Sequence, residues 1–317
     1  MEHFRRSLLV VLASPIVHPI PMSLSPATGF TNTTAVPLYW AAYGTPRSDP
    51  LLVLHGGPGA HHDYLLPQML ELAKHHRLIF YDQRGGGQSR DESREPITWQ
   101  THVADLAAVI GEFQLGHPTI VGYSWGGLLA MLYAIEGNRP GSSQSLPLPS
   151  RLILIDPAPA ESSFRRAMES EFAARQQAPA LLAKREELRA SGLRDSNPEA
   201  YKKRLFELSV AGYFYNSDAA RELTPFRVAG RIQDSVWRSL GDYDLLPSLR
   251  SLAIPALVLH GRDDPIPVQS SVKVADALGA RLVLLEKCGH VPYVERPSAL
   301  FSAMEGFLET QNAQKPE

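Results

Sequence analysis

Short apolar runs recur along the chain, and each is followed directly by a polar or glycine-rich segment. The six clearest runs lie at 51–54, 78–81, 118–121, 152–155, 256–259 and 282–285. An apolar run of this length predicts a strand that is buried on both faces of a sheet. We therefore expect a sheet whose central strands are covered on both sides.

Helical patterns separate these runs. Helices are predicted at 63–74, 103–113, 268–278 and 297–308, and directly after Ser124. Strands that alternate with helices predict an α/β fold with a doubly wound, mostly parallel sheet. The segment 33–44 instead predicts a β-hairpin ahead of the first buried strand.

The alternation stops over residues 157–240. Charged helical faces such as 184–187 and aromatic clusters such as 213–215 occur there, without any buried-strand pattern. We interpret 157–240 as a helical cap inserted over the sheet. The core then comprises residues 31–156 and 241–317.

Residues 1–30 are expected to form an N-terminal extension. Arg5 and Arg6 precede a short apolar run that prolines soon interrupt, which makes a poor export signal. The run is also far too short to span a bilayer. We expect a disordered extension or a weak signal, and favour a cytoplasmic location over export.

Composition narrows the classes of function. The chain has 317 residues, of which 44% are hydrophobic and 20% charged, as is typical of a soluble globular protein. With a formal net charge of −2, nothing favours nucleic acid or an anionic membrane as a partner. The single cysteine, Cys288, excludes an intrachain disulfide and a cysteine-based metal cluster. We assign no cofactor and no metal, and expect a small molecule or short peptide as substrate.

Two pairs of adjacent histidines could also be considered as metal ligands. They lie at 61–62 and 75–76, without the carboxylate or cysteine spacing of a metal site. We interpret them as solvated loop and helix-end residues.

The chemistry centres on Gly122, Ser124 and Gly126, which match the pattern G-x-S-x-G between a predicted strand and a helix. A sharp strand-to-helix turn exposes the serine hydroxyl, and the glycines permit close approach of neighbouring backbone. A serine nucleophile needs a histidine base and a carboxylate that orients the histidine. Asp264 and His290 each follow a later strand, in the chain order of an α/β-hydrolase triad.

Several motifs together resemble the prolyl iminopeptidase family of α/β-hydrolases. They are HGGPG at 55–59, DQRGGGQS at 82–89, GYSWGG at 122–127, GRDD at 261–264 and GHVP at 289–292. The resemblance covers the core and implies that Ser124 is the nucleophile, His290 the general base and Asp264, favoured over Asp263, the orienting acid. It also implies an oxyanion hole made by the backbone amides of Gly57 and Trp125. Asp82 and Arg84 are expected to hold the adjacent loop.

The cap departs from the family pattern. Enzymes that remove an N-terminal residue must bind its cationic amine. Members of the prolyl iminopeptidase family are similar to one another in placing glutamates of the cap at that amine. The W-x-x-W-E arrangement of the best-known bacterial branch is absent. Glu207 and Glu222 are the cap carboxylates predicted to take this role, and Tyr123 is a third candidate for substrate binding.

Alternatives to an aminopeptidase remain open at this point. The same triad serves esterases, amidases and lactonases that act on small neutral acyl substrates. A non-enzymatic hydrolase-fold receptor would be expected to lack a triad residue, whereas all three are present. A dehalogenase or epoxide hydrolase needs an aspartate at position 124 and is excluded by Ser124.

Overall fold

The computed structural model describes residues 25–93, 95–139 and 146–312. The N-terminal apolar run considered as an export signal lies outside these residues. No helix in the described ranges combines the length and the apolar composition needed to cross a membrane.

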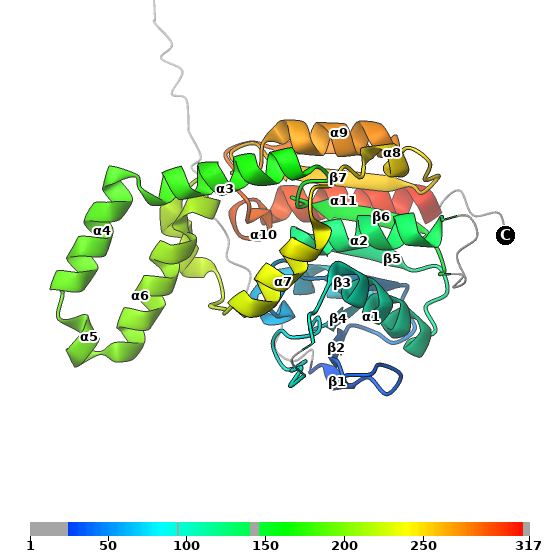
Figure 1. Cartoon of the computed structure of the whole chain (residues 1–317), viewed down its shortest axis with the longest axis horizontal. Coiled ribbons are helices and arrows are strands. Elements are labelled where there is room, and N and C mark those ends of the chain that lie inside the picture. The colour runs from blue at the N-terminus through cyan, green and yellow to red at the C-terminus, as the bar shows by residue number, and fades with distance from the viewer. Residues whose placement is uncertain (1–24, 94, 140–145, 313–317) are drawn as a thin grey trace, which may run out of the picture.

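A single sheet of eight strands forms the centre of the molecule (Figure 1). Its spatial order is β1-β2-β4-β3-β5-β6-β7-β8. The strands are β1 (Ala27–Phe30), β2 (Tyr39–Tyr43), β3 (Pro50–Leu54), β4 (Arg77–Tyr81), β5 (Thr119–Tyr123), β6 (Arg151–Ile155), β7 (Ala256–Gly261) and β8 (Arg281–Leu285). The pairs β1–β2 and β2–β4 are antiparallel, and all other neighbours are parallel. The predicted α/β fold with a mostly parallel sheet is therefore confirmed.

Alternate residues of the central strands enter two separate hydrophobic clusters. Leu52 and Ile120, which are register partners on β3 and β5, belong to one cluster, and Val53 and Val121 belong to the other. Successive strand side chains point to opposite faces, so an unbroken apolar run fills both clusters. The first cluster is covered by α1 (Trp99–Glu112), α2 (Trp125–Gly137) and α9 (Val268–Leu278), and the second by α11 (Pro297–Asn312) and the 3₁₀ helix η2 (Gln68–Lys74).

Two local predictions differ from the structure. The hairpin predicted at 33–44 contains only β2, because its partner β1 begins at Ala27, within the segment assigned to the N-terminal extension. β1 is a mostly exposed edge strand and therefore lacks the apolar signature of the buried strands. The single helix predicted at 63–74 is two 3₁₀ helices, η1 (His62–Leu65) and η2. Pro67 lies between them and has no amide hydrogen to continue a helical ladder.

The segment between β6 and β7 is helical. It contains α3 (Ser162–Gln176), α4 (Pro179–Ala190), α5 (Leu193–Ser196), α6 (Pro198–Val210), η3 (Ala211–Tyr213), η4 (Ser217–Glu222), α7 (Gly230–Leu240) and α8 (Leu246–Leu249). Figure 1 shows α4, α5 and α6 extending away from the sheet, while α7 returns beside it. The outer helices share a small apolar cluster of four buried residues, Leu181, Leu188, Leu208 and Ala211. A lobe with so small a core of its own depends on the main core for its position.

Candidate active site

Ser124 occupies a strained turn between β5 and α2. Its backbone angles are φ 52° and ψ −119°, in a region that costs a non-glycine residue about 1–3 kcal/mol. The flanking glycines make this turn possible. A β-carbon on Gly126 would lie 2.2 Å from the carbonyl oxygen of Leu54, and one on Gly122 would lie 2.5 Å from the carbonyl oxygen of Gly126. The strain is held by this packing, and it projects the serine hydroxyl out of the sheet edge.

The structure brings Ser124, His290 and Asp264 into one hydrogen-bonded chain. The Ser124 hydroxyl donates to Nε2 of His290 over 2.9 Å. His290 Nδ1 in turn donates to Oδ2 of Asp264 over 2.7 Å. The second carboxylate oxygen of Asp264 accepts the amide hydrogen of Ile266 over 2.7 Å. The carboxylate in this chain is that of Asp264, and its neighbour Asp263 takes no part in it.

The charge of Asp264 is stabilised by these partners. Its burial alone would raise the pKa of the carboxyl group, but the His290 ring and the hydrogen bonds from His290 and Ile266 hold the pKa below its usual value. The carboxylate therefore stays ionised at neutral pH. In that state it fixes the His290 tautomer with a bare Nε2 that faces the serine.

Gly57 and Trp125, the residues implied to form the oxyanion hole, line one pocket together with Ser124. Trp125 is the first residue of α2, so its amide hydrogen has no acceptor within the helix. Gly57 has φ 60°, a left-handed conformation that glycine adopts without strain. The neighbouring Gly56 lies directly against Ser124, where an added β-carbon would be 2.8 Å from the serine Cβ. The oxyanion hole itself stays a prediction of the resemblance.

Gln83 ties the two glycine-rich turns to Trp125. Its side chain accepts from the Trp125 indole over 2.7 Å and donates to the His55 carbonyl oxygen over 2.9 Å. Its backbone amide donates to Nε2 of His55 over 3.1 Å, while Nδ1 of His55 donates to Gly56 over 2.9 Å. Burial lowers the pKa of His55 to about 4, so the ring is neutral at pH 7. Sequence reasoning missed Gln83, although it stands between the two residues singled out in the same motif.

Asp82 and Arg84 serve separate networks. Asp82 accepts from the backbone and ring of His62 over 3.0 and 2.7 Å and from the amide of Gln88 over 2.9 Å. Arg84 pairs with Asp105 on α1. The interpretation of His62 as a solvated loop residue was wrong, because its ring is buried against Phe80 and bonded to Asp82.

The loop that carries His290 is held by the cap as well as by the core. The His290 amide donates to the carbonyl oxygen of Tyr213 over 2.6 Å. Glu295 accepts from the amides of Gly289, Tyr215 and Asn216 over 2.7, 3.2 and 2.9 Å. Glu295 thus links this loop to the cap, a role that no motif indicated.

Tyr123 lines the space in front of Ser124, which we call the catalytic pocket, but its hydroxyl is already engaged. It donates to the backbone oxygen of His290 over 2.8 Å, and its ring centroid lies 5.3 Å from that of His290. These contacts suit a positioning role toward His290. The predicted contact of Tyr123 with substrate stays a prediction.

A second buried carboxyl group, Asp156, lies behind the triad at the end of β6. One of its oxygens accepts the amide hydrogen of Gly261 over 2.7 Å, whereas the other has no hydrogen-bond partner. Asp156, His260 and Asp264 offer atoms within 4.8 Å of one another. The two ring nitrogens of His260 are already hydrogen-bonded to Ile266 and Ser271. The two carboxylate oxygens of Asp264 are already hydrogen-bonded to His290 and Ile266. We therefore assign this cluster no metal.

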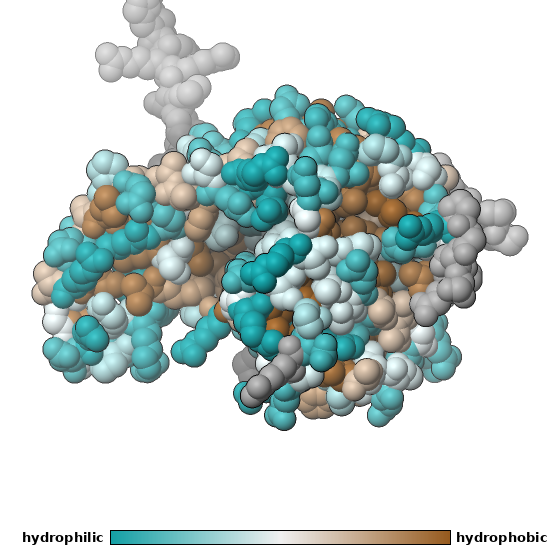
Figure 2. Space-filling model, in the orientation of Figure 1, coloured by the Kyte–Doolittle hydropathy of each residue, from teal (hydrophilic) through white to brown (hydrophobic). Residues whose placement is uncertain are grey.

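A pocket of about 730 Å³ opens above Ser124 between the core and the cap. Figure 2 shows the hollow between these two parts, with hydrophobic side chains along its cap side. The α3 face that lines it carries Arg165, Met168, Glu169 and Phe172, and the α7 face carries Gln233, Asp234, Trp237 and Arg238. These spacings, i, i+3, i+4, i+7 and i, i+1, i+4, i+5, each mark one face of a helix.

Neither predicted cap carboxylate faces this pocket. Glu207 is buried on α6 and paired with Arg204 over 2.7 Å, and the exposed Glu222 lies in η4. Instead, Glu169 and Asp234 line it. Glu169 pairs with Arg165 over 2.7 Å, whereas Asp234 forms no ion pair with any described residue. Their helical spacing beside aromatic residues was the signal available in the sequence.

The comparisons with known proteins agree with this geometry. A profile of the alpha/beta hydrolase family matches residues 51–303. The chain belongs to the alpha/beta hydrolase family. Proline iminopeptidase from Lactobacillus crispatus is 28% identical over 281 residues, which are 82% of this chain and 90% of that protein. The protein is therefore a hydrolase with similarity to proline iminopeptidases.

Solved structures share the fold at lower identity. A proline iminopeptidase-related protein from Thermus thermophilus has a TM-score of 0.67 and 22% identity, covering 90% of this chain and 97% of that one. An N-acyl homoserine lactone degrading enzyme has a TM-score of 0.60 and 22% identity, covering 88% and 100%. At this level of identity the likeness extends to the fold alone.

Proposed function

We propose that the protein is a serine hydrolase that releases an N-terminal residue, proline by preference, from short peptides through an acyl-enzyme on Ser124. The hydrogen-bonded chain from the Ser124 hydroxyl through His290 to Asp264 carries this proposal. Such a chain activates a hydroxyl that is otherwise a poor nucleophile at neutral pH.

The reaction follows from the positions of these groups. Ser124 Oγ attacks the carbonyl carbon of the substrate's first residue while Nε2 of His290 takes the hydroxyl proton. The amides of Trp125 and Gly57 stabilise the resulting oxyanion, and each such donor typically contributes about 3 kcal/mol to the transition state. His290 then gives its proton to the departing amine, leaving an ester on Ser124. Water activated by the same histidine hydrolyses that ester.

The cap side of the pocket supports an amine-bearing substrate. A cationic amine buried against an apolar wall needs a carboxylate partner. Asp234 supplies a carboxylate that pairs with no described cation, and Glu169 supplies one that is shared with Arg165. The stacked rings of Phe172 and Tyr213, whose centroids are 4.2 Å apart, offer an apolar surface suited to a pyrrolidine ring.

The alternative is an esterase, amidase or lactonase for small neutral acyl substrates. One observation favours it: Arg165 and Arg238 balance Glu169 and Asp234 in the pocket lining, so the pocket has no net acidic charge. The likeness in fold to a lactone-degrading enzyme is compatible with this alternative.

A comparison of substrates decides between the two. Turnover of proline-, alanine- and leucine-arylamides is measured beside that of short p-nitrophenyl esters. We expect the proline-arylamide to be the best amide substrate, and Asp234→Asn to raise its KM about fivefold, the upper range for an exposed ion pair, with little change for the esters.

The matched control is Glu222→Gln, which removes an exposed cap carboxylate outside the pocket and should alter neither substrate. If Asp234→Asn affects amide and ester alike, or if acetylation of the proline nitrogen improves turnover, the aminopeptidase assignment is wrong and the esterase alternative holds.

A further inference from the structure

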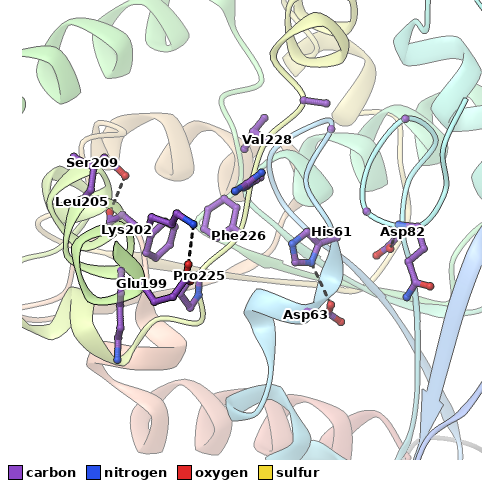
Figure 3. Close-up of a pocket in the computed structure, with 18 of the residues that line it drawn as sticks. His61, Asp63, Asp82, Glu199, Lys202, Leu205, Ser209, Pro225, Phe226 and Val228 are labelled. Carbon is purple, nitrogen blue, oxygen red and sulfur yellow. Dashed lines mark hydrogen bonds and ion pairs between the residues drawn. The ribbon is translucent and has the colours of Figure 1, made fainter. Parts of the chain in front are cut away.

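A second, larger groove adjoins the catalytic pocket. It has a volume of about 1500 Å³ and lies between α6, the segment 225–229 and the glycine-rich core loops (Figure 3). Figure 3 shows Lys202, Leu205 and Ser209 on the cap side, and His61 and Asp82 on the core side. The groove thus joins the same two parts of the molecule as the catalytic pocket does.

The two spaces share one wall. Phe206, Ser209, Phe226 and Val228 line both the groove and the catalytic pocket. Within this wall the Phe206 and Phe226 rings meet edge to face, with centroids 5.5 Å apart. Val228 stands over the oxyanion turn, since a β-carbon on Gly57 would lie 3.9 Å from its Cγ2. A substrate bound at Ser124 therefore meets this wall directly, and beyond it the open groove.

The charged side chains of the groove leave an excess of positive charge. Four basic side chains, of Arg90, Lys202, Lys203 and Arg227, line the groove against the three carboxylates of Asp63, Asp82 and Glu199. Glu199 pairs with Lys202 over 2.7 Å, and Asp63 and Asp82 share the ring of His62 over 3.2 and 2.7 Å. Arg90, Lys203 and Arg227 also line the groove, and none of them forms an ion pair with a described residue.

The groove is also apolar along part of its length. Leu205 and Val228 are 48% and 37% exposed, and they are two of the five large hydrophobic side chains that are exposed among the described residues. Apolar side chains beside unpaired cations complement a ligand that has apolar groups and a negative end.

From this arrangement we infer that the groove holds the part of a peptide substrate that follows the scissile bond, with Arg90, Lys203 and Arg227 binding its C-terminal carboxylate. This inference rests on the proposed peptidase function. The catalytic pocket receives the N-terminal residue, and the open groove receives the rest of the chain. The preferred substrates are then short peptides with a free carboxylate, not proteins or C-terminally amidated peptides.

The experiment compares the tetrapeptide Pro-Ala-Ala-Ala with its C-terminal amide at low salt. We expect kcat/KM to be about tenfold higher for the free acid, since one exposed ion pair contributes at most about fivefold and three cations act together. The ratio should fall toward one in 0.5 M NaCl, because salt screens exposed charges. It should also fall toward one in the triple variant Arg90→Gln, Lys203→Gln, Arg227→Gln.

The matched control is Arg189→Gln, which removes a cation from the exposed Arg189–Glu186 pair on α4, outside both spaces. It should keep the wild-type ratio. Because the readout is a ratio of two substrates on one protein, a general loss of folded enzyme does not change it.

The outcomes separate the two proposals. If the enzyme cleaves proline-arylamide but treats the acid and the amide alike, the groove inference is overturned and the peptidase proposal survives. A preference for the acid that persists in the triple variant also overturns it. If neither arylamide nor peptide is cleaved while esters are, both proposals fail.

Discussion

The two walls of the catalytic pocket differ in how their polar groups are held. On the core side, Ser124, His290, Asp264 and Gln83 each have hydrogen-bond partners at fixed positions, and most of them are buried. On the cap side, the charged residues lie on the surfaces of α3 and α7, where Arg165 and Glu169 pair one turn apart and Asp234 forms no ion pair with a described residue.

This difference separates chemistry from selectivity. A preorganised network lowers the barrier because its groups need no rearrangement during the reaction. Exposed helical pairs each contribute little energy and change easily between sequences. We therefore expect core substitutions to abolish the reaction, and cap substitutions to alter which substrate reacts.

The largest effect is expected at the nucleophile. Ser124→Ala removes the attacking oxygen, so kcat should fall by about 10⁴-fold or more for every substrate. An organophosphonate should label the wild-type protein once, on Ser124, as measured by intact mass and peptide mapping. Circular dichroism should show that the variant is folded. Wild-type turnover in this variant would refute the acyl-enzyme mechanism.

A comparable loss is expected at the orienting acid. Asp264→Asn should lower kcat about 10⁴-fold, because the amide favours the wrong tautomer of His290. The neighbouring variant Asp263→Asn is the control and should retain most of the activity, since its side chain lies outside the triad. Steady-state kinetics on one arylamide and one ester measure both. Equal losses in the two variants would contradict the assignment of Asp264.

Asp156 is an exception among the polar groups of the core, because one of its carboxylate oxygens has no hydrogen-bond partner among the described residues. It therefore tests the contrast between the core side and the cap side. Burial and the charge of Asp264 raise the pKa of Asp156 well above its usual value, so the folded protein holds its neutral form to a higher pH than the unfolded chain does. The unfolded chain ionises it near pH 4. Its contribution to stability is thus complete below that pH and declines as pH rises toward the folded pKa.

Asp156→Asn removes this titration. The difference in the free energy of unfolding, variant minus wild type, should therefore increase with pH, by up to about 1.4 kcal/mol for each pH unit between pH 5 and 7. Urea unfolding at pH 5, 6 and 7 measures the difference, and Asp263→Asn serves as the control. A difference that does not change with pH would mean that Asp156 is ionised in the folded protein.

The smallest effect is expected at Glu207 in the cap. Glu207→Gln breaks only the pair with Arg204, whose side chain is 39% exposed, so stability should fall by about 0.5 kcal/mol. Kinetics on arylamides and esters should not change, because Glu207 lines neither the catalytic pocket nor the groove. A large rise in the KM for proline-arylamide would restore the original assignment of Glu207 to substrate binding.

The sequence predicted the core closely for a local reason. The bounds of β3 and β4 differ by one residue from the apolar runs 51–54 and 78–81, and α9 has the predicted bounds 268–278. A strand that is buried on both faces has an unbroken run of apolar residues, which can be recognised in the sequence. The edge strand β1 is mostly exposed and has no such run. The segment 63–74 was predicted as one helix, but Pro67 divides it.

Two features of the site could not be predicted in the same way. Gln83 acts through contacts with His55 and Trp125, which are 28 and 42 residues away in the chain. Glu295 acts through backbone amides of the cap, 79 and 80 residues away. Such contacts depend on how distant segments pack and have no local pattern.

The sequence by itself determined the α/β fold, the order of Ser124, Asp264 and His290, and their places after three strands. Parallel strands deliver their carboxyl ends to one edge of the sheet, so these three residues were placed at the same edge. Tertiary structure alone decided that Asp234 faces the pocket while Glu207 turns to Arg204. Charged helices of the cap can present several faces with similar local energy, and only their packing against the core selects one.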